Sequence, residues 1–304
     1  MSARPTIFTL TGNLLAERTL EFGPWQIGST QRALHESFHT RGKGVNVTKM
    51  LQRLGTASTA LLFAGGPSGE ECEAWLRQHE LPYRCFAINA GTRTGTVIWS
   101  EQVPETTFLG PDVIPDDEAV RACANFLNAQ PDGQVLALCG SFPGWDELVY
   151  APLRSAIDRW IDRGRLFADV YGPPLKSLVE RPLELIKINQ QEFAAFFPAT
   201  ERAVSTEQRL RAMSQRSPVK QWVISNGPRS VWVLPRRGDP IEIAPPPVKE
   251  VSPTGSGDVL FAAILHALLI RGTSLVEAVD FGLPLASANA AHPSVADFVL
   301  PANL

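Results

Sequence analysis

The chain has 304 residues, a formal net charge of -3 and a pI near 6.0, and 44% of its residues are hydrophobic. This composition supplies a large core, and α/β chains of this length often fold as one unit. Charged residues make up only 19%, with both signs interspersed, which argues against a nucleic-acid-binding face. The longest apolar stretch, within 259–270, contains His266 and is too short to cross a bilayer. We expect neither nucleic acid nor a membrane as a partner.

The cysteines and the N-terminal residues bear on the cellular compartment. Cys72, Cys85, Cys123 and Cys139 are widely separated, form no C-x-x-C pair and have no histidine at metal-ligand spacing. The opening "MSARPTIFTL" lacks the long apolar segment of a secretory signal. The sequence therefore predicts buried thiols in a reducing compartment and a cytoplasmic protein.

Apolar runs typical of strands alternate with amphipathic segments typical of helices along most of the chain. The predicted strands are 6–10, 59–65, 134–140, 165–170, 183–189, 221–226 and 230–234. The predicted helices are 43–55, 68–80, 115–129, 147–164 and 205–216. This alternation predicts an α/β fold with a central, mostly parallel sheet and helices on both faces.

Two segments interrupt this alternation. Residues 14–40 and 93–110 lack helical periodicity and alternate apolar with polar residues, as in "TGTVIWSE", so we predict a small inserted β-sheet. The chain would form one domain, 1–304, with a core of about 1–12, 41–90 and 111–304 and an insertion of about 13–40 and 91–110. His35 and His39 would share one face there, but they have no third ligand close by, so we expect no metal site.

Polar clusters follow four of the predicted strands. They are "GGPSG" (65–69), "GSFP" (140–143), "NQQE" (189–192) and "SNGP" (225–228). Ligands of open parallel sheets bind beyond the carboxyl ends of the strands. These clusters therefore indicate a binding site along one edge of the sheet.

The stretch "SPTGSGDVLFAAILHALL" (252–269) places a single acid, Asp258, at the start of an apolar helix. One interpretation is an ordinary N-terminal helix residue that accepts unpaired N–H groups. The other is catalytic, because Gly255, Ser256 and Gly257 can turn their N–H groups towards an anion at the positive end of the helix. A carboxylate repels a phosphate as a ligand, but it suits a base that takes the proton of an attacking hydroxyl. We expect the helix dipole to keep Asp258 ionised and weaken it as a base, which a loose phosphoryl-transfer transition state tolerates.

Other polar residues of the same edge suit a nucleotide. Asn189 and Glu192, three residues apart, suit Mg²⁺ that keeps its waters, and Lys187 suits a phosphate. Ser225 and Gly227 allow the backbone to approach a nucleotide closely. The alternative is that both segments are simple turns. The chain has no G-x-x-x-x-G-K-[ST] and no G-x-G-x-x-G after its first strand, which argues against P-loop kinases and dinucleotide enzymes.

Several motifs together resemble the PfkB (ribokinase-like) carbohydrate kinases over the whole chain. "SPTGSGDVLFAAIL" resembles the C-terminal signature of this family, and "GKGVNVTKMLQRLG" (42–55) followed by Gly65 resembles its N-terminal signature. "KINQQE" is similar to the "KPNxxE" of the family, "ISNGP" to its "SxGxxG", and "GSFP" to the "GSLP" of its phosphosugar kinases. The resemblance implies a ribokinase-like fold in which the inserted strands form a lid over the sugar.

The resemblance also implies roles for individual residues. Asp258 would be the catalytic base, and Gly255, Ser256 and Gly257 the anion hole. The residues expected at Mg·ATP are Lys187, Asn189, Glu192, Ser225, Gly227, Leu283 and Ser287, with Mg²⁺ held through water by Asn189 and Glu192. A homodimer formed through the lid is expected as well, because an exposed small sheet needs cover.

The acceptor predicted from the resemblance is a ketohexose phosphate: fructose 1-phosphate, fructose 6-phosphate or tagatose 6-phosphate. Lys43, Arg93 and Arg32 match cations of the phosphosugar branch, and Arg suits a phosphate through paired hydrogen bonds. The further residues expected at the acceptor are Glu17, Gly42, Asn46 and Ser141.

This sequence departs from the family motifs mainly in the half that would bind the acceptor. "NLLAE" (13–17) stands where the family has "NPAxD", so Glu17 is one methylene longer than the usual acid. "TFLG" (107–110) replaces "NEPG", and Arg41 stands where a small residue is usual. The alternatives left open are a same-fold kinase of an unphosphorylated sugar or nucleoside, a noncatalytic nucleotide- or sugar-phosphate-binding protein, and a dinucleotide oxidoreductase.

Overall fold

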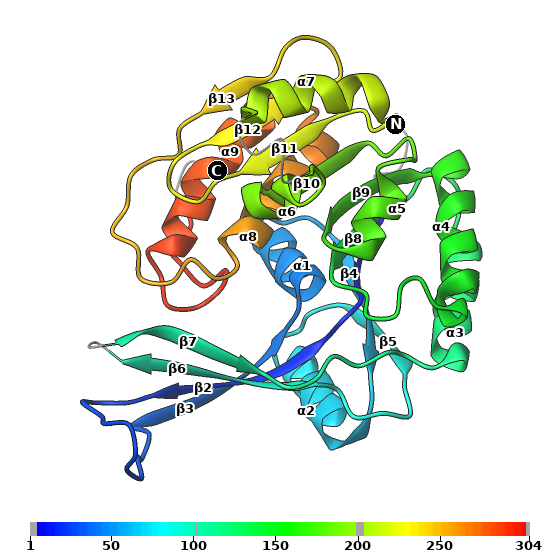
Figure 1. Ribbon diagram of the computed structural model, residues 1–304. Helices are drawn as coiled ribbons and strands as arrows, with labels where there is room; N and C mark the ends of the chain where they lie inside the picture. The colour runs from blue at the N-terminus through cyan, green and yellow to red at the C-terminus, as the bar shows by residue number, and fades with distance from the viewer. Residues whose placement is uncertain (1–4, 101–102, 199–203, 302–304) are drawn as a thin grey trace.

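The computed structural model describes residues 5–100, 103–198 and 204–301, and its core is a nine-stranded sheet (Figure 1). The strands of this sheet are β1 (Ile7–Thr11), β4 (Ser58–Ala64), β5 (Tyr83–Ala87), β8 (Val135–Gly140), β9 (Arg165–Val170), β10 (Leu185–Asn189), β11 (Trp222–Ser225), β12 (Val231–Leu234) and β13 (Ile241–Ile243). Their order is β13-β12-β11-β10-β9-β8-β1-β4-β5, and only the pairs β11–β12 and β12–β13 are antiparallel. The predicted mostly parallel sheet is confirmed.

Helices cover both faces of this sheet, as predicted. They are α1 (Lys43–Arg53), α2 (Gly66–Gln78), α3 (Asp117–Asn128), α4 (Ala151–Arg163), α5 (Pro173–Leu178), α6 (Gln190–Ala194), α7 (Thr206–Arg216), α8 (Ser256–His266) and α9 (Leu275–Ala290). One apolar layer packs under α3, α4 and α7 and includes Trp160; the other packs under α1, α8 and α9 and includes Phe261. Successive residues of β1 alternate between the layers, with Phe8 in the first and Ile7 in the second.

The sequence prediction missed β5, β13, α5 and α6. β5 and β13 lie at the two edges of the sheet, where burial is partial and the apolar pattern is weak. α5 has 6 residues and α6 has 5, too short for a 3.6-residue periodicity to be visible. These short elements depend on the rest of the fold more than on their own sequence.

A second, four-stranded sheet is inserted into the core, also as predicted. It consists of β2 (Leu15–Glu21), β3 (His35–Arg41), β6 (Thr94–Ser100) and β7 (Val103–Leu109), in the order β3-β2-β6-β7. We call this sheet the lid. Figure 1 shows the lid strands extending beneath the loop that follows α9. Thr254, in the loop before α8, donates a hydrogen bond from its hydroxyl to Glu105 of β7 at 2.9 Å, so the lid touches that loop directly.

The polar clusters predicted to share an edge do lie along one edge. β1, β4, β8, β9, β10 and β11 are parallel, so their carboxyl ends point the same way. Asn189 at the end of β10 is in register with Ser225 of β11, and Gly140 of β8 is in register with Val170 of β9. Polar side chains from distant parts of the sequence therefore meet there.

Two simpler expectations concern membranes and thiols. None of the helices in the described parts of the chain has the length and hydropathy to cross a membrane. The four cysteines are free thiols; Cys72, Cys123 and Cys139 are buried, and Cys85 is half-buried. Burial raises the pKa of the Cys72 thiol to about 11, so this thiol is unreactive at neutral pH.

Candidate active site

A cavity of about 520 Å³ lies at the carboxyl edge of β10 and β11, against the start of α8. Its walls contain most of the residues predicted for a nucleotide together with the predicted catalytic group: Lys187, Asn189, Ser225, Gly227, Gly255, Ser256, Gly257, Asp258, Leu283 and Ser287. Lys43 also lines it, although the sequence assigned Lys43 to the acceptor. Four prolines, Pro228, Pro245, Pro246 and Pro253, also line this cavity.

The loop before α8 requires its glycines. Gly255 has φ +73, a left-handed conformation that disfavours any residue with a Cβ atom. A Cβ on Gly257 would lie 2.7 Å from Nζ of Lys187, so the ammonium group of Lys187 lies directly against this loop. The loop therefore presents backbone N–H groups, a helix N-terminus and a cation to the same part of the cavity, an arrangement that suits an anion.

Asp258 lies in the first turn of α8, is 6% exposed, and accepts a hydrogen bond from Asn46 at 2.7 Å. Burial raises the pKa of Asp258 to about 6; the carboxylate of Asp169 adds to the rise, while Lys43 and Lys187 oppose it. The prediction of a weak base was wrong, because desolvation of the carboxylate outweighs the helix dipole. At neutral pH this group is ionised and also basic enough to accept a proton.

Asp169, near the end of β9, organises the lysines of the site. Its carboxylate is fully buried and accepts hydrogen bonds from Nζ of Lys43 and Nζ of Lys187, each at 2.7 Å. Burial alone would raise the pKa of Asp169, but the two ammonium groups hold it below its usual value. Burial opposes the charge of Lys43, yet Asp169 and Glu192 raise its pKa above the usual value. Lys43 is therefore charged, and the hydrogen bonds to Asp169 fix the position of both lysine side chains.

Asn189 and Glu192 form the capping box of α6. The side chain of Asn189 accepts hydrogen bonds from the N–H groups of Gln191 and Glu192, and Oε2 of Glu192 accepts one from the N–H of Asn189 at 2.9 Å. Oε1 of Glu192 lies 3.5 Å from Nζ of Lys43. The pair is thus the helix-capping turn of the simpler interpretation, and Asn189 also lines the cavity, whereas Glu192 does not.

A second cavity, of about 410 Å³, lies between the lid and the loops 251–254 and 293–295. Glu17 and Arg41 line it, and Nε of Arg41 donates a hydrogen bond to Oε1 of Glu17 at 2.9 Å. Both side chains are only 9% exposed. Two of the residues at which this sequence departs from the family motifs are therefore partners in one buried ion pair.

His39 lines the same cavity from β3. Its Nε2 lies 3.0 Å from the hydroxyl of Ser37, and burial, together with the charges of Arg41 and Lys49, lowers the pKa of His39 to about 4. His39 is therefore neutral at neutral pH.

Across the described ranges no group of three or more His, Cys, Asp or Glu side chains is arranged to hold a metal ion.

Arg93 and Ser141, both predicted at the acceptor, are brought together through Asn13. Nδ2 of Asn13 donates hydrogen bonds to Ser141 at 3.2 Å and to Asp112 at 2.7 Å. Arg93, whose side chain is 13% exposed, forms an ion pair with Asp112 at 3.0 Å. The guanidinium of Arg93, predicted to bind a phosphate, is therefore paired with Asp112, an acid that the sequence analysis did not consider.

Gly42 and Arg32 were also predicted to bind the acceptor, and the structure places them apart from each other. Gly42 precedes α1 with φ +149, and a Cβ there would lie 2.5 Å from Cγ2 of Thr11, so α1 begins directly on the end of β1. Arg32 is exposed in the loop between β2 and β3 and lines neither cavity. The structure does not bring Arg32 to the other acceptor residues of this chain.

Comparison with known families agrees with this geometry. The family model described as pfkB family carbohydrate kinase matches residues 15–303, nearly the whole chain. The chain belongs to the pfkB family of carbohydrate kinases. It is a phosphotransferase that uses an alcohol group as acceptor, and kinases of this family use ATP.

Curated relatives of this pfkB kinase are similar along most of their length. The 1-phosphofructokinase of Borreliella burgdorferi is 26% identical over 96% of this chain and 94% of the relative. The ATP-dependent 6-phosphofructokinase isozyme 2 of Escherichia coli is 28% identical over 83% and 81%. The D-tagatose-1-phosphate kinase of Bacillus licheniformis is 29% identical over 66% and 65%.

Solved structures show the same fold. Phosphofructokinase-2 from Escherichia coli in complex with fructose-6-phosphate has a TM-score of 0.83 at 24% identity, covering 95% of this chain and 94% of the other. Ribokinase from Thermotoga maritima has a TM-score of 0.70 at 17% identity, covering 97% and 95%. The ribokinase-like fold expected from the motifs is confirmed.

Sequence reasoning missed Asp169, Asp112 and Asn289 of this kinase. A signal existed for Asp169, because "RLFADV" carries one acid at the carboxyl end of an otherwise apolar strand, the position where ligands bind. Asn289 is fully buried in α9, and its side chain donates to the carbonyl of Thr254 and the hydroxyl of Ser256. Its signal was a lone amide in an apolar helix, since buried polar groups need partners.

The ion pair between Glu17 and Arg41 predicts a specific pattern of stabilities. We expect Arg41→Met to lower the free energy of unfolding by about 3–5 kcal/mol, because it leaves a buried carboxylate without its partner. Arg41→Met combined with Glu17→Gln removes both charges and is expected to recover most of that loss. Urea unfolding of the single and double variants measures the difference.

Arg18→Met is the matched control, because Arg18 pairs with Glu36 and Glu71 on the exposed side of the lid. We expect a change of less than about 1 kcal/mol there. Equal destabilisation in the single and the double Arg41 variants would contradict the buried pair.

Proposed function

We propose that this protein is an ATP-dependent kinase that transfers the γ-phosphoryl group of ATP to a hydroxyl of a ketohexose phosphate. The acceptors proposed are fructose 1-phosphate, fructose 6-phosphate or a tagatose phosphate. The relatives support this choice, since their names include 1-phosphofructokinase, 6-phosphofructokinase and D-tagatose-1-phosphate kinase.

The observation that carries the proposal is the position of Asp258. Its buried carboxylate, with a pKa raised to about 6 by burial, stands one residue after the anion-binding loop Gly255–Gly257 and near two charged lysines. A carboxylate is a poor ligand for a phosphate, so a binding role alone does not explain it. A base for the attacking hydroxyl does.

In the proposed reaction the loop and the lysines bind phosphate, and Asp258 accepts a proton. The acceptor oxygen forms a bond to the γ phosphorus as the bond from that phosphorus to the β–γ bridging oxygen breaks, and ADP leaves. The hydroxyl proton passes to the carboxylate of Asp258. Lys43 and Lys187 offset negative charge on the phosphates, and the N–H groups of the loop orient the transferred group.

Mg²⁺ would come with the nucleotide. The residues present fit a metal held by phosphates and water, because both oxygens of Asp169 already bind lysines, and Oε1 of Glu192 lies 3.5 Å from Nζ of Lys43, which lines the cavity. The Oδ1 of Asn189 accepts two backbone N–H groups, so Asn189 acts through its position in the capping turn. The ion would supply charge neutralisation at the phosphates.

Asn13, Arg93 and Ser141 are the groups that we propose for the phosphate of the acceptor. They lie together, and a guanidinium with amide and hydroxyl neighbours suits a phosphate. The ion pair of Arg93 with Asp112 favours the second candidate, a kinase of an unphosphorylated sugar, because Asp112 would repel a phosphate. Measurement on both classes of acceptor has to decide.

Assembly and location complete the proposal. We propose that residues 1–304 act as one ribokinase-like unit with the lid as its insertion, and that two copies associate through their lids. Phe108 of the lid is 58% exposed and Leu34 at its edge is 64% exposed, which supports contact with another surface. Free cysteines support a reducing compartment such as the cytoplasm.

The first test is ADP release with Mg·ATP against fructose 1-phosphate, fructose 6-phosphate, tagatose 1-phosphate, tagatose 6-phosphate, fructose, ribose and adenosine. We expect turnover on a phosphosugar, and a loss of about 10²- to 10⁴-fold in kcat for Asp258→Asn with ATP binding retained.

Asp116→Asn is the matched control, because Asp116 caps α3 and has no contact with the cavity. Its kcat should stay near that of the unsubstituted protein. Full turnover by Asp258→Asn would refute the role of Asp258, and turnover on neutral acceptors alone would favour the second candidate.

The pH dependence of kcat follows from the pKa of Asp258. The base works when ionised, so we expect kcat to be constant above pH 7 and to fall as the pH drops through about 6, the raised pKa of this carboxyl. Steady-state rates from pH 4.5 to 8.5, limited to the range in which the fold persists, measure this. The residual activity of Asp258→Asn should lack that decline. A rate that stays nearly constant down to pH 4.5, as a carboxyl with the ordinary pKa of 3.8 would give, would contradict the effect of burial.

Arg93 and Asp112 should have opposite effects on a phosphorylated acceptor. Arg93→Met is expected to raise its KM by roughly tenfold or more, because a charged hydrogen bond is lost, and Asp112→Asn to lower it. KM for ATP should not change in either variant. The control is Arg121→Met, since Arg121 pairs with Asp117 on the exposed face of α3. If Arg93→Met leaves the KM of every phosphosugar unchanged, the phosphate binds elsewhere.

A further inference from the structure

The segment 295–298, which follows α9, packs against the anion-binding loop. The space that a Cβ of Gly255 would occupy is filled by Val295, whose Cγ1 lies 2.3 Å from that point. Val295 is itself 2% exposed and belongs to the apolar layer under α1, α8 and α9. The position of this one side chain therefore limits where Gly255 and its N–H group can lie.

Asn289 links the same segment to the loop through hydrogen bonds. Its Nδ2 donates to the carbonyl of Thr254 at 2.9 Å and to the hydroxyl of Ser256 at 3.0 Å, while its Oδ1 accepts from the N–H of Ala296 at 2.8 Å. Asn289 is fully buried. Displacement of the segment 295–298 would break these contacts.

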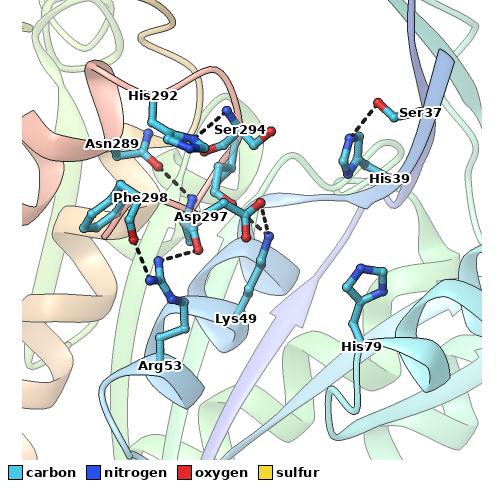
Figure 2. Close-up of polar contacts among 12 residues, drawn as sticks. Ser37, His39, Lys49, Arg53, His79, Asn289, His292, Ser294, Asp297 and Phe298 are labelled. Atoms are coloured by element: carbon cyan, nitrogen blue, oxygen red, sulfur yellow. Dashed lines mark hydrogen bonds and ion pairs between the residues drawn. The ribbon is translucent and has the colours of Figure 1, made fainter. Parts of the chain in front are cut away.

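Two cations of α1 hold the segment from the other side (Figure 2). Nζ of Lys49 binds the carbonyl of Val295 at 3.0 Å and the carboxylate of Asp297 at 2.7 Å. Arg53, one helical turn further along, binds the carbonyl of Ala296 at 2.7 Å and that of Phe298 at 2.5 Å. Its guanidinium also lies 5.2 Å from the ring centre of Phe298.

The backbone at Ala296 shows that these contacts are needed. Ala296 has φ +55, a left-handed conformation that is unfavourable for a residue with a Cβ atom. Such a conformation persists only where the surroundings hold it. Asn289 binds the N–H of Ala296 and Arg53 binds its carbonyl, so both sides of this residue are fixed.

The same helix also reaches the catalytic carboxylate. Asn46, near the start of α1, donates to Asp258, and Lys49 and Arg53 lie further along α1. One rigid helix thus fixes Asp258 directly and the loop before it through the segment 295–298.

We propose that Lys49 and Arg53 are positioning residues for phosphoryl transfer: they hold the segment 295–298, and this segment holds the anion-binding loop in the geometry that the reaction needs. The inference rests on the proposed kinase function. Neither side chain lines the cavity that contains Asp258, so both act through the segment.

The test compares Lys49→Met and Arg53→Met with Arg163→Met. Arg163 is the matched control, because its guanidinium also binds backbone carbonyls, those of Leu127 and Gln130, away from both cavities. We expect kcat to fall roughly 10- to 100-fold in the two α1 variants, with the KM values of ATP and acceptor within a few-fold. Arg163→Met should leave kcat unchanged at a similar loss of stability. Arg53→Lys, which keeps the charge, should recover much of the loss.

A second readout does not depend on any acceptor. Amide hydrogen exchange of the peptide covering 254–258, measured without ligands, should become faster in Lys49→Met and Arg53→Met and stay unchanged in Arg163→Met. If the unsubstituted protein phosphorylates nothing, the proposed function fails, and this exchange still tests the coupling. Unchanged exchange at 254–258, or a kcat loss no larger than that of Arg163→Met, would overturn the inference.

Discussion

The fully buried carboxylate of Asp169 binds two ammonium groups, and the polar part of the candidate site depends on that arrangement. Lys43 begins α1, Lys187 lies in β10 and Asp169 lies in β9, so three elements from different parts of the chain meet at one carboxylate. Without the acid, two cations would lie near each other with little water to screen them, and their repulsion would be large. Asp169 therefore allows the side chains of Lys43 and Lys187 to lie close together in the cavity that contains Gly255, Ser256 and Gly257.

The protonation of Asp258 follows from the same group of charges. Asp169 and Asp258 lie close to Lys43 and Lys187, so phosphates that bind in the cavity would meet lysine side chains that are already in position. Burial raises the pKa of Asp258, and Lys43 and Lys187 limit the rise. A base with a pKa of about 6 is the result of this balance. Either effect alone would give a carboxyl that is protonated at neutral pH or a carboxylate too weak to accept a proton.

The parts of the site that sequence analysis predicted are those that are local in the chain. Gly255, Ser256, Gly257 and Asp258 are consecutive, so the loop, the helix start and the acid are visible in one stretch. The direction of the pKa shift of Asp258 was not predictable, because it depends on burial under α1 and on a carboxylate from β9. Leu283 and Ser287 could be placed only through the family resemblance, since nothing in an apolar helix indicates which side faces a cavity.

The ion pair of Glu17 and Arg41 shows the same limit more clearly. Both residues were recognised as departures from the family motifs, but their partnership depends on the register of β2 and β3. In that register Leu15 lies opposite Arg41 and Glu17 opposite His39, so Glu17 and Arg41 are diagonal neighbours on one face of the lid. No feature of the sequence fixes that register to the residue.

The ion pair of Glu17 and Arg41 also explains how the two substitutions relative to the family motifs can coexist in the lid. An arginine buried under the lid without a partner would be costly, and a glutamate in place of the usual aspartate supplies a partner at 2.9 Å. The two departures therefore compensate each other in charge. The stretch 255–258 and Lys187 keep the pattern of the family motifs, and the departures concentrate in the half of the site that we propose for the acceptor. An acceptor that enters the lid cavity would meet the carboxylate of Glu17 already paired with Arg41, and a guanidinium where the family motif usually has a small residue.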